Sequence, residues 1–479
     1  MLLMRHAYID QETPRAASAP LRICCSPMKS INPATGEMIQ EYAEHTAADV
    51  DLALDSALNA FAAWRLETIA ARGELLRAAA TVLRRRLPEY ARLMTLEMGK
   101  PIAAAEAEVE KCASGCEHFA EHAAGYLGLR TVASDAQASY VRHDPLGVVL
   151  AIMPWNFPFW QVFRCAAPAL MAGNTVVLKH ASNVPGCARA IADVFRQAGL
   201  PPGAFVSLLV PSSRAESLVT DPRIAAVSLT GSEPAGRAIA AAAGRSLKKT
   251  VLELGGSDAF VVLADADPQW AARQAAAARC INNGESCIAA KRFIVEEPIA
   301  QAFERGLIES MAAMVVGDPL DRATQIGPLA RPDLADTLED QVARSVAAGA
   351  KLETGGRRLA RPGSFFPPTV LTRVSPGMAV FDEETFGPVA PVIRARDAEH
   401  AVALANASRF GLGASVWTAD AARGEALAAR IEAGAVFVNG AVKSDPRLPF
   451  GGIKSSGYGR ELSAEGIREF VNVKTVWRA

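Results

Sequence analysis

The feature that most constrains the fold of this chain is a regular alternation of β-rich and helical segments from residue 147 onward. Short β-rich runs, GVVLAIM, TVVLK, VSLLV, AAVSLT and TVLEL, alternate with stretches of helical periodicity at 158–172, 185–198 and 234–244. Such alternation with short connections is typical of a mostly parallel sheet covered by helices on both faces. Because ligands bind such sheets outside the carboxyl ends of the strands, we expect the functional residues directly after strands.

The rest of the chain divides into a helical segment, a second strand-rich segment and an N-terminal tail. Residues 46–130 are rich in Ala, Leu, Glu and Arg, with apolar residues three and four positions apart, which predicts helices. From residue 292, the runs RFIVEE, FFPPTVLTRV, PVAPVIRA, GASVWT and AGAVFVNG predict a second α/β domain. Residues 1–27 contain Asp10 and Glu12 and no continuous apolar core, so we expect a loose tail and not a secretory signal.

Charge and hydropathy exclude several classes of partner. The chain carries 50 Lys and Arg against 51 Asp and Glu, so no basic surface for nucleic acid or an anionic membrane is expected. No apolar stretch reaches the roughly 18 residues that a membrane-spanning helix requires. With 479 residues, the chain is long enough for two or three domains, and we expect a cytoplasmic protein whose partners are small molecules.

The eight cysteines are expected to be free thiols, because disulfide frameworks belong mainly to small secreted domains. Cys112 and Cys116 lie one helical turn apart, and His118 and His122 follow them. Metal sites usually place a ligand pair across a turn, with further ligands downstream. We therefore predict core cysteines here and no metal site.

Three of the predicted strands end in residues suited to ligand binding. Backbone N–H groups at the start of the helix after AAVSLT, together with the hydroxyl of Ser232, form a positive pocket suited to a phosphate. The alternative is that Ser232 is an ordinary helix cap. The chain contains neither a GxGxxG fingerprint nor a Walker A loop, so neither common nucleotide motif supports this assignment. The residues that follow the three strands are Pro154, Trp155 and Asn156, then Lys179, then Thr230, Gly231 and Ser232.

Cys287 and Glu253 are the candidates for nucleophile and base. Cys287 follows a Gly-Glu-Ser turn and opens a run with helical character, so its backbone N–H and the positive helix end are expected to favour the thiolate. The alternative is a packed core cysteine. Glu253 lies in the hydrophobic run TVLEL, where loss of hydration is expected to raise its pKa toward the range useful for proton transfer. The alternative is an exposed glutamate at a strand end.

Seven motifs connect these candidates in one order along the chain: PWNFPFW, LKHAS, LTGS, LELGG, NNGESC, EETFGPV and PFGGIKSSGYGRE. In this order they resemble the aldehyde dehydrogenase superfamily, from residue 31 to the C-terminus. Within it, LKHASNVPG, LELGGSD, CIAAKRFIVEE and PFGGIKSSGYGREL most resemble the succinate-semialdehyde dehydrogenase branch. The resemblance implies an α/β fold with a loose tail (1–27), a Rossmann-like cofactor-binding domain (28–129 and 148–250), a second α/β catalytic domain (251–440) and a small β oligomerisation arm (130–147 and 460–479).

The resemblance implies NAD(P)-dependent oxidation of an aldehyde to a carboxylic acid. Cys287 matches the nucleophile of the family and Glu253 its general base. In the implied reaction the thiolate adds to the aldehyde carbon, and the Asn156 amide and the Cys287 N–H stabilise the oxyanion. After hydride transfer, water deprotonated by Glu253 hydrolyses the thioester. The alternative for Asn156 is a helix cap.

By the same resemblance, both NAD and NADP are candidate cofactors, and we expect NADP to be preferred. Lys179 matches a lysine that reaches the adenosine ribose, and Ser182 stands where many NAD-preferring relatives carry a glutamate. A glutamate repels a 2′-phosphate, whereas a serine beside Lys179 leaves room and one favourable charge, with His180 as a candidate for a second. Glu384 and Phe386 match residues that hold the nicotinamide ribose and ring, and a plain loop before a strand is the alternative. The cofactor-binding candidates are Trp155, Lys179, Ser182, Gly231, Ser232, Leu254, Glu384 and Phe386.

Arg164 is the candidate for substrate selection. It lies eight positions beyond Asn156 on a predicted helix, and helical side chains lean back toward the N-terminus. Its guanidinium is therefore expected to clamp the carboxylate of a short ω-semialdehyde, as a matching arginine does in relatives. A second arginine of some relatives is replaced by Ile281. Lys443 or Arg447 is the candidate for the second charge, unless both are solvated loop residues.

Glu285 is a further departure from the family, because relatives commonly carry a glutamine two residues before the cysteine. A carboxylate near Cys287 is expected to raise the pKa of the thiol. The first chemical step then slows, unless the side chain points away.

The segments ASYVRHDPLG and EFVNVKTVWR match the oligomerisation arm of the family, and their polar and apolar residues alternate. Unpaired edges of such an arm stay exposed in a monomer, so we expect a homodimer or homotetramer.

The sequence leaves several functions open, with oxidation of succinate semialdehyde to succinate in first place. A second is oxidation of other short ω-semialdehydes or of neutral or aromatic aldehydes. A third is an acylating enzyme that releases the thioester to coenzyme A, against which the retained Glu253 argues. A fourth is a non-catalytic binding protein on the same fold.

Overall fold

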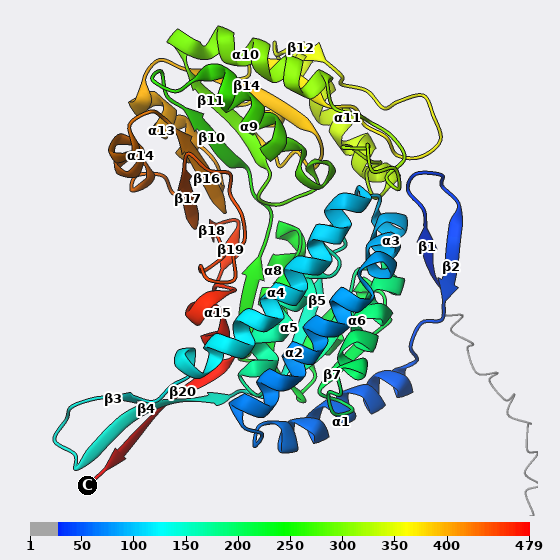
Figure 1. The fold of residues 1–479 in the computed structure, drawn as a ribbon, viewed down its shortest axis with the longest axis vertical. Helices are drawn as coiled ribbons and strands as arrows, with labels where there is room; N and C mark the ends of the chain where they lie inside the picture. Colours follow the sequence, from blue (N-terminus) through cyan, green and yellow to red (C-terminus); the bar gives the residue numbers. More distant parts are fainter. Residues whose placement is uncertain (1–26) are drawn as a thin grey trace, which may run out of the picture.

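The computed structural model describes residues 27–479 and contains two large, mostly parallel sheets with smaller β elements (Figure 1). The tail predicted at residues 1–27 lies outside the described residues, apart from Pro27. The α/β architecture predicted from the alternating runs is confirmed. Within the described part of the chain, no helix has both the length and the apolar character needed to cross a membrane.

The first sheet has six strands in the order β19-β9-β8-β5-β6-β7, and only the pairing of β19 with β9 is antiparallel. Successive side chains point to opposite faces, so Val149 and Ala151 pack on one group of helices while Val148 and Leu150 pack on another. The strands are β5 (Val148–Met153), β6 (Thr175–His180), β7 (Phe205–Leu208), β8 (Ile224–Thr230), β9 (Lys249–Glu253) and β19 (Gly457–Tyr458).

Apolar stripes on the helices complete the core on both faces of this sheet. The helices α2 (Ile69–Arg85), α3 (Leu87–Met98), α4 (Ile102–Tyr126), α5 (Trp160–Met171) and α6 (Pro185–Gln197) share one face. The helices α1 (Ala47–Trp64), α7 (Ala215–Thr220) and α8 (Glu233–Arg245) share the other. The buried carboxylate of Glu108, on α4, accepts hydrogen bonds from the N–H groups of Phe159 and Trp160, both 2.9 Å, and so fixes the start of α5.

The second sheet has seven strands in the order β12-β13-β14-β11-β10-β16-β17, and only β12 runs antiparallel to its neighbour. Helices α9 (Pro268–Cys280) and α10 (Glu297–Ala312) pack on one face. Helices α11 (Pro332–Ala347), α12 (Ala379–Asp382), α13 (Ala398–Asn406) and α14 (Ala421–Ala428) pack on the other. The strands are β10 (Asp258–Val262), β11 (Ala290–Glu296), β12 (Lys351–Thr354), β13 (Thr369–Thr372), β14 (Val389–Ala395), β16 (Gly413–Trp417) and β17 (Ala435–Val438).

The segments predicted to form an arm pair with each other in a third sheet, which projects from the body of the molecule (Figure 1). Strands β3 (Arg130–Thr131), β4 (Ala138–Pro145) and β20 (Val471–Arg478) lie in the order β20-β4-β3. The predicted boundary between the two large domains, at residue 250, falls within β9, and the division itself remains a prediction. The remaining elements are β1 (Met28–Ile31), β2 (Met38–Tyr42), η1 (Ser212–Arg214), η2 (Ile281–Gly284), β15 (Phe410–Gly411), β18 (Ile453–Lys454) and α15 (Ser463–Arg468).

Candidate active site

A cavity of about 280 Å³, which we call the first cavity, lies at the carboxyl ends of β5, β8 and β9. These strands are parallel neighbours, so residues distant in sequence follow them at one edge of the sheet. Most of the residues predicted at strand ends therefore lie together. The lining consists of Pro154, Trp155, Asn156, Thr230, Gly231, Ser232, Leu254, Gly255, Cys287, Arg331, Leu334, Glu384 and Phe386.

The lining of the first cavity fits a nicotinamide nucleotide. The rings of Trp155 and Phe386 meet edge to face with centroids 5.8 Å apart and offer apolar walls to a flat ring. Glu384 accepts a hydrogen bond of 3.1 Å from the N–H of Gly256. A Cβ at Gly255 would stand 2.3 Å from the Glu384 carboxylate, so this position needs glycine for Glu384 to lie there.

Ser232 occupies the N-cap position of α8, but its side chain makes no capping hydrogen bond. The alternative of an ordinary serine cap is therefore wrong. Packing requires glycine at position 236, in the first turn of α8, because a Cβ there would lie 2.6 Å from the side chain of Leu254. The side chain of Ser232 thus lines the first cavity at the N-terminus of a helix, the part of a helix that attracts phosphate.

Cys287 lies in a loop between α9 and β11, and the helix predicted to start at this residue is absent. Two consecutive residues, Asn282 and Asn283, have positive φ angles of 53° and 59°, a conformation that Asn tolerates better than most residues. The chain then enters the buried strand β11 at Ala290, because the run from there to Glu296 is wholly buried between its two parallel neighbours. The predicted stabilisation of a thiolate by a helix end is therefore wrong.

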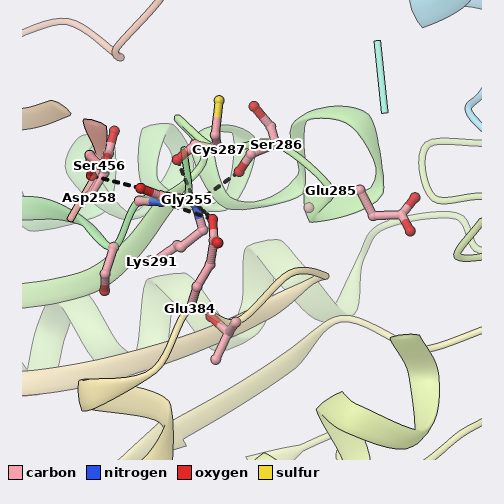
Figure 2. A network of polar contacts seen from close by, with 12 residues as sticks. Gly255, Asp258, Glu285, Ser286, Cys287, Lys291, Glu384 and Ser456 are labelled. Atoms are coloured by element: carbon pink, nitrogen blue, oxygen red, sulfur yellow. Dashed lines mark hydrogen bonds and ion pairs between the residues drawn. The ribbon is translucent and has the colours of Figure 1, made fainter. Parts of the chain in front are cut away.

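Side-chain hydrogen bonds to the backbone hold this loop in place. The amide of Asn282 donates to the carbonyl oxygens of Asn156, at 2.9 Å, and Glu285, at 3.0 Å. The buried Lys291 donates to the carbonyl oxygens of Ser286, at 2.9 Å, and Cys287, at 2.6 Å (Figure 2). Each of these bonds satisfies a backbone acceptor that the loop conformation leaves without a partner.

Asn156 is directed at the same loop, because its amide donates a hydrogen bond of 3.1 Å to the carbonyl oxygen of Glu285. It is not a helix cap, since α5 begins at Trp160 with Phe159 in the cap position. Asn156 and Cys287 both line the first cavity, so the predicted pair of oxyanion donors comes from two residues that face one space.

The thiol of Cys287 is protonated at neutral pH in this structure. The surrounding protein raises its pKa to about 12, because the charged form loses hydration. The cations of Arg164 and Lys291 oppose this rise, but they do not outweigh it. This direction is opposite to the one expected from a helix end, so formation of the thiolate requires a base.

Glu253 is buried, with 2% of its surface exposed, so the alternative of an exposed residue at a strand end is wrong. Burial raises the pKa of Glu253 well above its usual value, and the nearby carboxylate of Glu461 raises it further. Neither carboxylate oxygen of Glu253 has a hydrogen-bond partner among the described residues. The direction of the predicted pKa shift is therefore correct, although Glu253 does not line the first cavity.

A second cavity, of about 70 Å³, also adjoins Cys287, so the cysteine lies between two cavities. The second cavity combines apolar walls with three cationic side chains. Its lining consists of Lys111, Phe157, Trp160, Gln161, Arg164, Ile281, Ser286, Cys287, Ile288, Val442, Lys443, Ser444 and Phe450.

Arg164 lies in the second cavity as predicted, but its charge already has a partner. It is buried and forms an ion pair with Glu461, which is buried to the same extent. It also donates a hydrogen bond of 3.3 Å to Thr230, and its guanidinium stacks 4.6 Å from the ring centroid of Phe450. The clamp on the substrate carboxylate therefore remains a prediction. The charge of Arg164 is already largely neutralised by Glu461 within the protein.

Of the two candidates for a second substrate-binding charge, the second cavity includes only Lys443. Arg447 is exposed and bonds both oxygens of Asp445, at 2.8 and 2.6 Å. The prediction for Arg447 is wrong, because its side chain is engaged at the surface. Ile281, which replaces the second arginine of relatives, is half-exposed on the cavity wall.

Glu285 does not act on the cysteine. Figure 2 shows its carboxylate pointing away from the sulfur of Cys287. It accepts a hydrogen bond of 2.9 Å from the N–H of Ala330, and burial raises its pKa well above the usual value. The expected rise of the thiol pKa from this residue is therefore wrong, and the alternative that it points away is correct.

Lys179 and Ser182 lie beyond the first cavity, at the end of β6 and just after it. Burial lowers the pKa of Lys179, and no described carboxylate forms an ion pair with it. His180 is buried, and its Nε2 donates a hydrogen bond of 2.8 Å to the carbonyl oxygen of Pro158. Burial lowers the pKa of His180 to about 4, so it is neutral at pH 7 and cannot add a positive charge for a phosphate. That expectation is wrong.

Cys112 and Cys116 are fully buried core residues of α4, and burial raises the pKa of both thiols. Within residues 27–479, no group of three His, Cys, Asp or Glu is placed to hold a metal ion.

Three charged residues near Cys287 were missed by the sequence analysis. Glu461 pairs with Arg164, Lys291 holds the cysteine loop, and Lys111 lines the second cavity. No local signal marks Lys111 or Glu461 as a member of the site, because Ser444 and Arg164, their partners, lie far away in the sequence. Lys291 lies only four residues after Cys287, and that proximity was the signal that could have identified it.

Comparison of the chain with models of known protein families identifies the family to which it belongs. The model described as "Aldehyde dehydrogenase family" matches residues 24–476, which is nearly the whole chain. The chain belongs to the aldehyde dehydrogenase family. The resemblance inferred from the seven motifs is thereby confirmed.

Individual relatives are similar along nearly their whole length. The chain is 54% identical to a probable succinate-semialdehyde dehydrogenase [NADP(+)] of Synechocystis sp., over 94% of this chain and 99% of the relative. It is 51% identical to succinate-semialdehyde dehydrogenase [NADP(+)] 1 of Mycobacterium bovis, over 95% of this chain and 100% of the relative. Among solved structures, succinic semialdehyde dehydrogenase from Streptococcus pyogenes with NADP+ aligns with a TM-score of 0.92 at 36% identity, covering 94% of this chain and 99% of that one.

Proposed function

We propose that this aldehyde dehydrogenase oxidises succinate semialdehyde to succinate, with NADP+ as the preferred electron acceptor. One observation carries the proposal: Cys287 lies between a cavity that fits a nicotinamide and a smaller cavity with cationic side chains. Relatives more than 50% identical carry the same substrate and cofactor in their names. The volume of about 70 Å³ in the second cavity favours a short chain over an aromatic ring.

The preference for NADP+ rests on the end of β6. Lys179 has no ion-pair partner among the described residues, and the exposed Ser182 adds no negative charge beside it. One unpaired cation near the ribose attracts a 2′-phosphate, and a carboxylate at position 182 would repel it. Ser232 and the N-terminus of α8 bind the pyrophosphate in this proposal.

In the first half of the reaction, Cys287 becomes the nucleophile. Glu253 accepts the thiol proton through a water molecule, the sulfur forms a bond to the aldehyde carbon, and the carbonyl oxygen becomes an oxyanion. The amide of Asn156 and the N–H of Cys287 donate hydrogen bonds to that oxyanion. Trp155 and Phe386 would hold the nicotinamide in the first cavity, where it would supply the acceptor for the hydride of the aldehyde carbon.

In the second half, the thioester on Cys287 is hydrolysed. Glu253 first releases the thiol proton to solvent, and its carboxylate then takes a proton from a water molecule, whose oxygen adds to the thioester carbon. The carbon–sulfur bond then breaks, so the acid leaves and the sulfur regains a proton. The raised pKa of Glu253 suits both proton transfers, because a carboxylate with a raised pKa is a stronger base.

The assay of this proposal measures reduced-cofactor absorbance with succinate semialdehyde, glutarate semialdehyde, butanal and benzaldehyde, each with NADP+ and NAD+. We expect the highest kcat/KM for succinate semialdehyde with NADP+, and no activity for Cys287→Ala. Equal kcat/KM for butanal and succinate semialdehyde would contradict the proposed substrate. Added coenzyme A that converts the product from succinate to its thioester would instead support the acylating alternative.

A further inference from the structure

The second cavity contains a lysine that the mechanism above does not use. Lys111, on α4, donates a hydrogen bond of 2.7 Å to the hydroxyl of Ser444. Its ammonium also lies 4.5 Å from the ring centroid of Trp160, whose indole N–H donates to the same hydroxyl at 2.9 Å. Two donors from different elements therefore fix Ser444, and the hydroxyl proton is left to donate to a ligand.

Lys111 differs from the buried cations Lys100 and Arg164 in having no carboxylate partner among the described residues, and it differs from Lys443, which also lacks one, in being half-buried and not exposed. Lys100 forms a buried ion pair with Glu108, and Arg164 forms one with Glu461. No described Asp or Glu lies within ion-pair distance of Lys111, although its side chain is half-buried. A partly desolvated cation without a partner is costly, and a bound anion removes that cost.

We propose that Lys111, oriented by Ser444 and Trp160, binds the distal carboxylate of the substrate and gives the enzyme its preference for carboxylated aldehydes. The inference rests on the proposed function and assigns the charge-selective contact within it. The aldehyde carbon lies at Cys287, and the carboxylate lies at the far side of the same cavity, where the Lys111 ammonium and the Ser444 hydroxyl donate to it. Arg164, already paired with Glu461, lines the same cavity.

The charge of Lys111 is sensitive to pH near neutrality. Burial, and after it the nearby cation of Arg164, lower the pKa of Lys111 to about 8. The groups that face it are Glu108 and Cys112 on its own helix, Arg164 on α5, and Lys443 and Asp445 on the loop that carries Ser444. The free enzyme therefore carries this positive charge below about pH 8 and loses it above that pH.

The test is the ratio of kcat/KM for succinate semialdehyde to kcat/KM for butanal, measured at pH 7 with NADP+. Lys111→Met is expected to lower this ratio roughly 10- to 100-fold, which is the effect of losing one charge-assisted hydrogen bond. The loss is expected to appear as a change in KM for succinate semialdehyde. Lys111→Arg keeps a cation and is expected to restore most of the ratio. Lys351→Met, on the edge strand of the second sheet, is the matched control and leaves the ratio unchanged.

A second measurement needs no substitution at the site. In the wild-type enzyme the ratio is expected to fall as the pH rises through about 8, whereas in Lys111→Arg it is expected to stay level, because arginine keeps its proton. The comparison with butanal cancels the titration of Cys287 and Glu253, which both substrates share.

A ratio of kcat/KM values that stays at the wild-type value in Lys111→Met overturns the inference. If kcat/KM falls equally for both aldehydes in that variant, the role of Lys111 is structural. A collapse of the ratio in Lys443→Met but not in Lys111→Met assigns the contact to Lys443. These results leave the proposed function intact, whereas a wild-type enzyme without preference for succinate semialdehyde overturns both.

Discussion

At the residue scale, loss of hydration dominates the ionisation of the groups around Cys287. Burial raises the pKa of Cys287 to about 12 and that of Glu253 well above its usual value, despite nearby cations. Both shifts disfavour the charged forms, so the thiolate and the carboxylate form less readily here than in water. The sequence indicated Cys287 and Glu253 as the candidates, but not the direction of the shift at Cys287, because that depends on burial by distant segments.

Replacement of Glu253 tests its assignment as the base. Glu253→Gln is expected to lower kcat roughly 100- to 10,000-fold, because both proton transfers lose their acceptor. Because the pKa of Glu253 is raised above its usual value, wild-type kcat should rise with pH as the carboxylate forms, and the variant should lose that part of the profile. Stopped-flow and steady-state measurements of reduced cofactor across pH 6–10 check both effects.

The control for this substitution is Glu285→Gln, which changes a carboxyl that is equally buried but points away from the sulfur. Glutamine keeps an acceptor for the N–H of Ala330, so kcat and the pH profile are expected to match the wild type. A wild-type profile in Glu253→Gln would show that another group is the base.

At the scale of elements, the strands were predictable and the cysteine loop was not. The β-rich runs that end at Met153, Thr230 and Glu253 became neighbouring parallel strands, because apolar periodicity and short connections act locally. The run after Cys287 is rich in alanine and was predicted as helix, yet it enters strand β11. Its conformation depends on pairing with β10 and β14, which lie elsewhere in the sequence.

Dependence on distant segments also explains why the sequence analysis did not identify Lys111 as a substrate contact. Its partner Ser444 is 333 positions away, and nothing in the local sequence of α4 connects the two. The resemblance to the family supplied residues at matching motif positions, and Lys111 lies in none of the seven motifs. Contacts of this kind follow from the packing of the two large sheets and not from any single segment.

The loop between α9 and β11 depends on Lys291, which offers a prediction at this scale. Lys291→Met leaves the carbonyl oxygens of Ser286 and Cys287 without their donor, at a cost of about 1–3 kcal/mol each. We expect a lower urea midpoint and a kcat reduced roughly 100-fold, because the nucleophile shifts from its position.

Lys249→Met is the matched control, since that lysine forms a half-exposed ion pair with Glu469 that contributes little to stability. Urea unfolding followed by fluorescence and steady-state assays compare the two variants. A Lys291→Met enzyme with unchanged kcat would show that the loop keeps its position without this lysine.

At the scale of the whole molecule, the three-stranded sheet is the part that a single chain leaves incomplete. It projects from the body, and β20 is an edge strand that pairs with β4 alone among the strands of residues 27–479 (Figure 1). Val473 and Trp477 on β20 are 60% and 53% exposed. A long edge strand with exposed apolar side chains pairs readily with another strand, so we propose that β20 adjoins a second copy of this chain.

Light scattering after size exclusion tests this arrangement. The wild type is expected to have at least twice the 50.5 kDa mass of one chain, and the double variant Val473→Lys, Trp477→Lys is expected to shift toward 50.5 kDa, because buried lysines oppose association. Leu352→Lys changes an exposed apolar residue on β12, the edge strand of the second sheet, and should leave the mass unchanged. A wild-type mass of 50.5 kDa would contradict the assembly, while a dimer that persists in the double variant would move the interface to another surface.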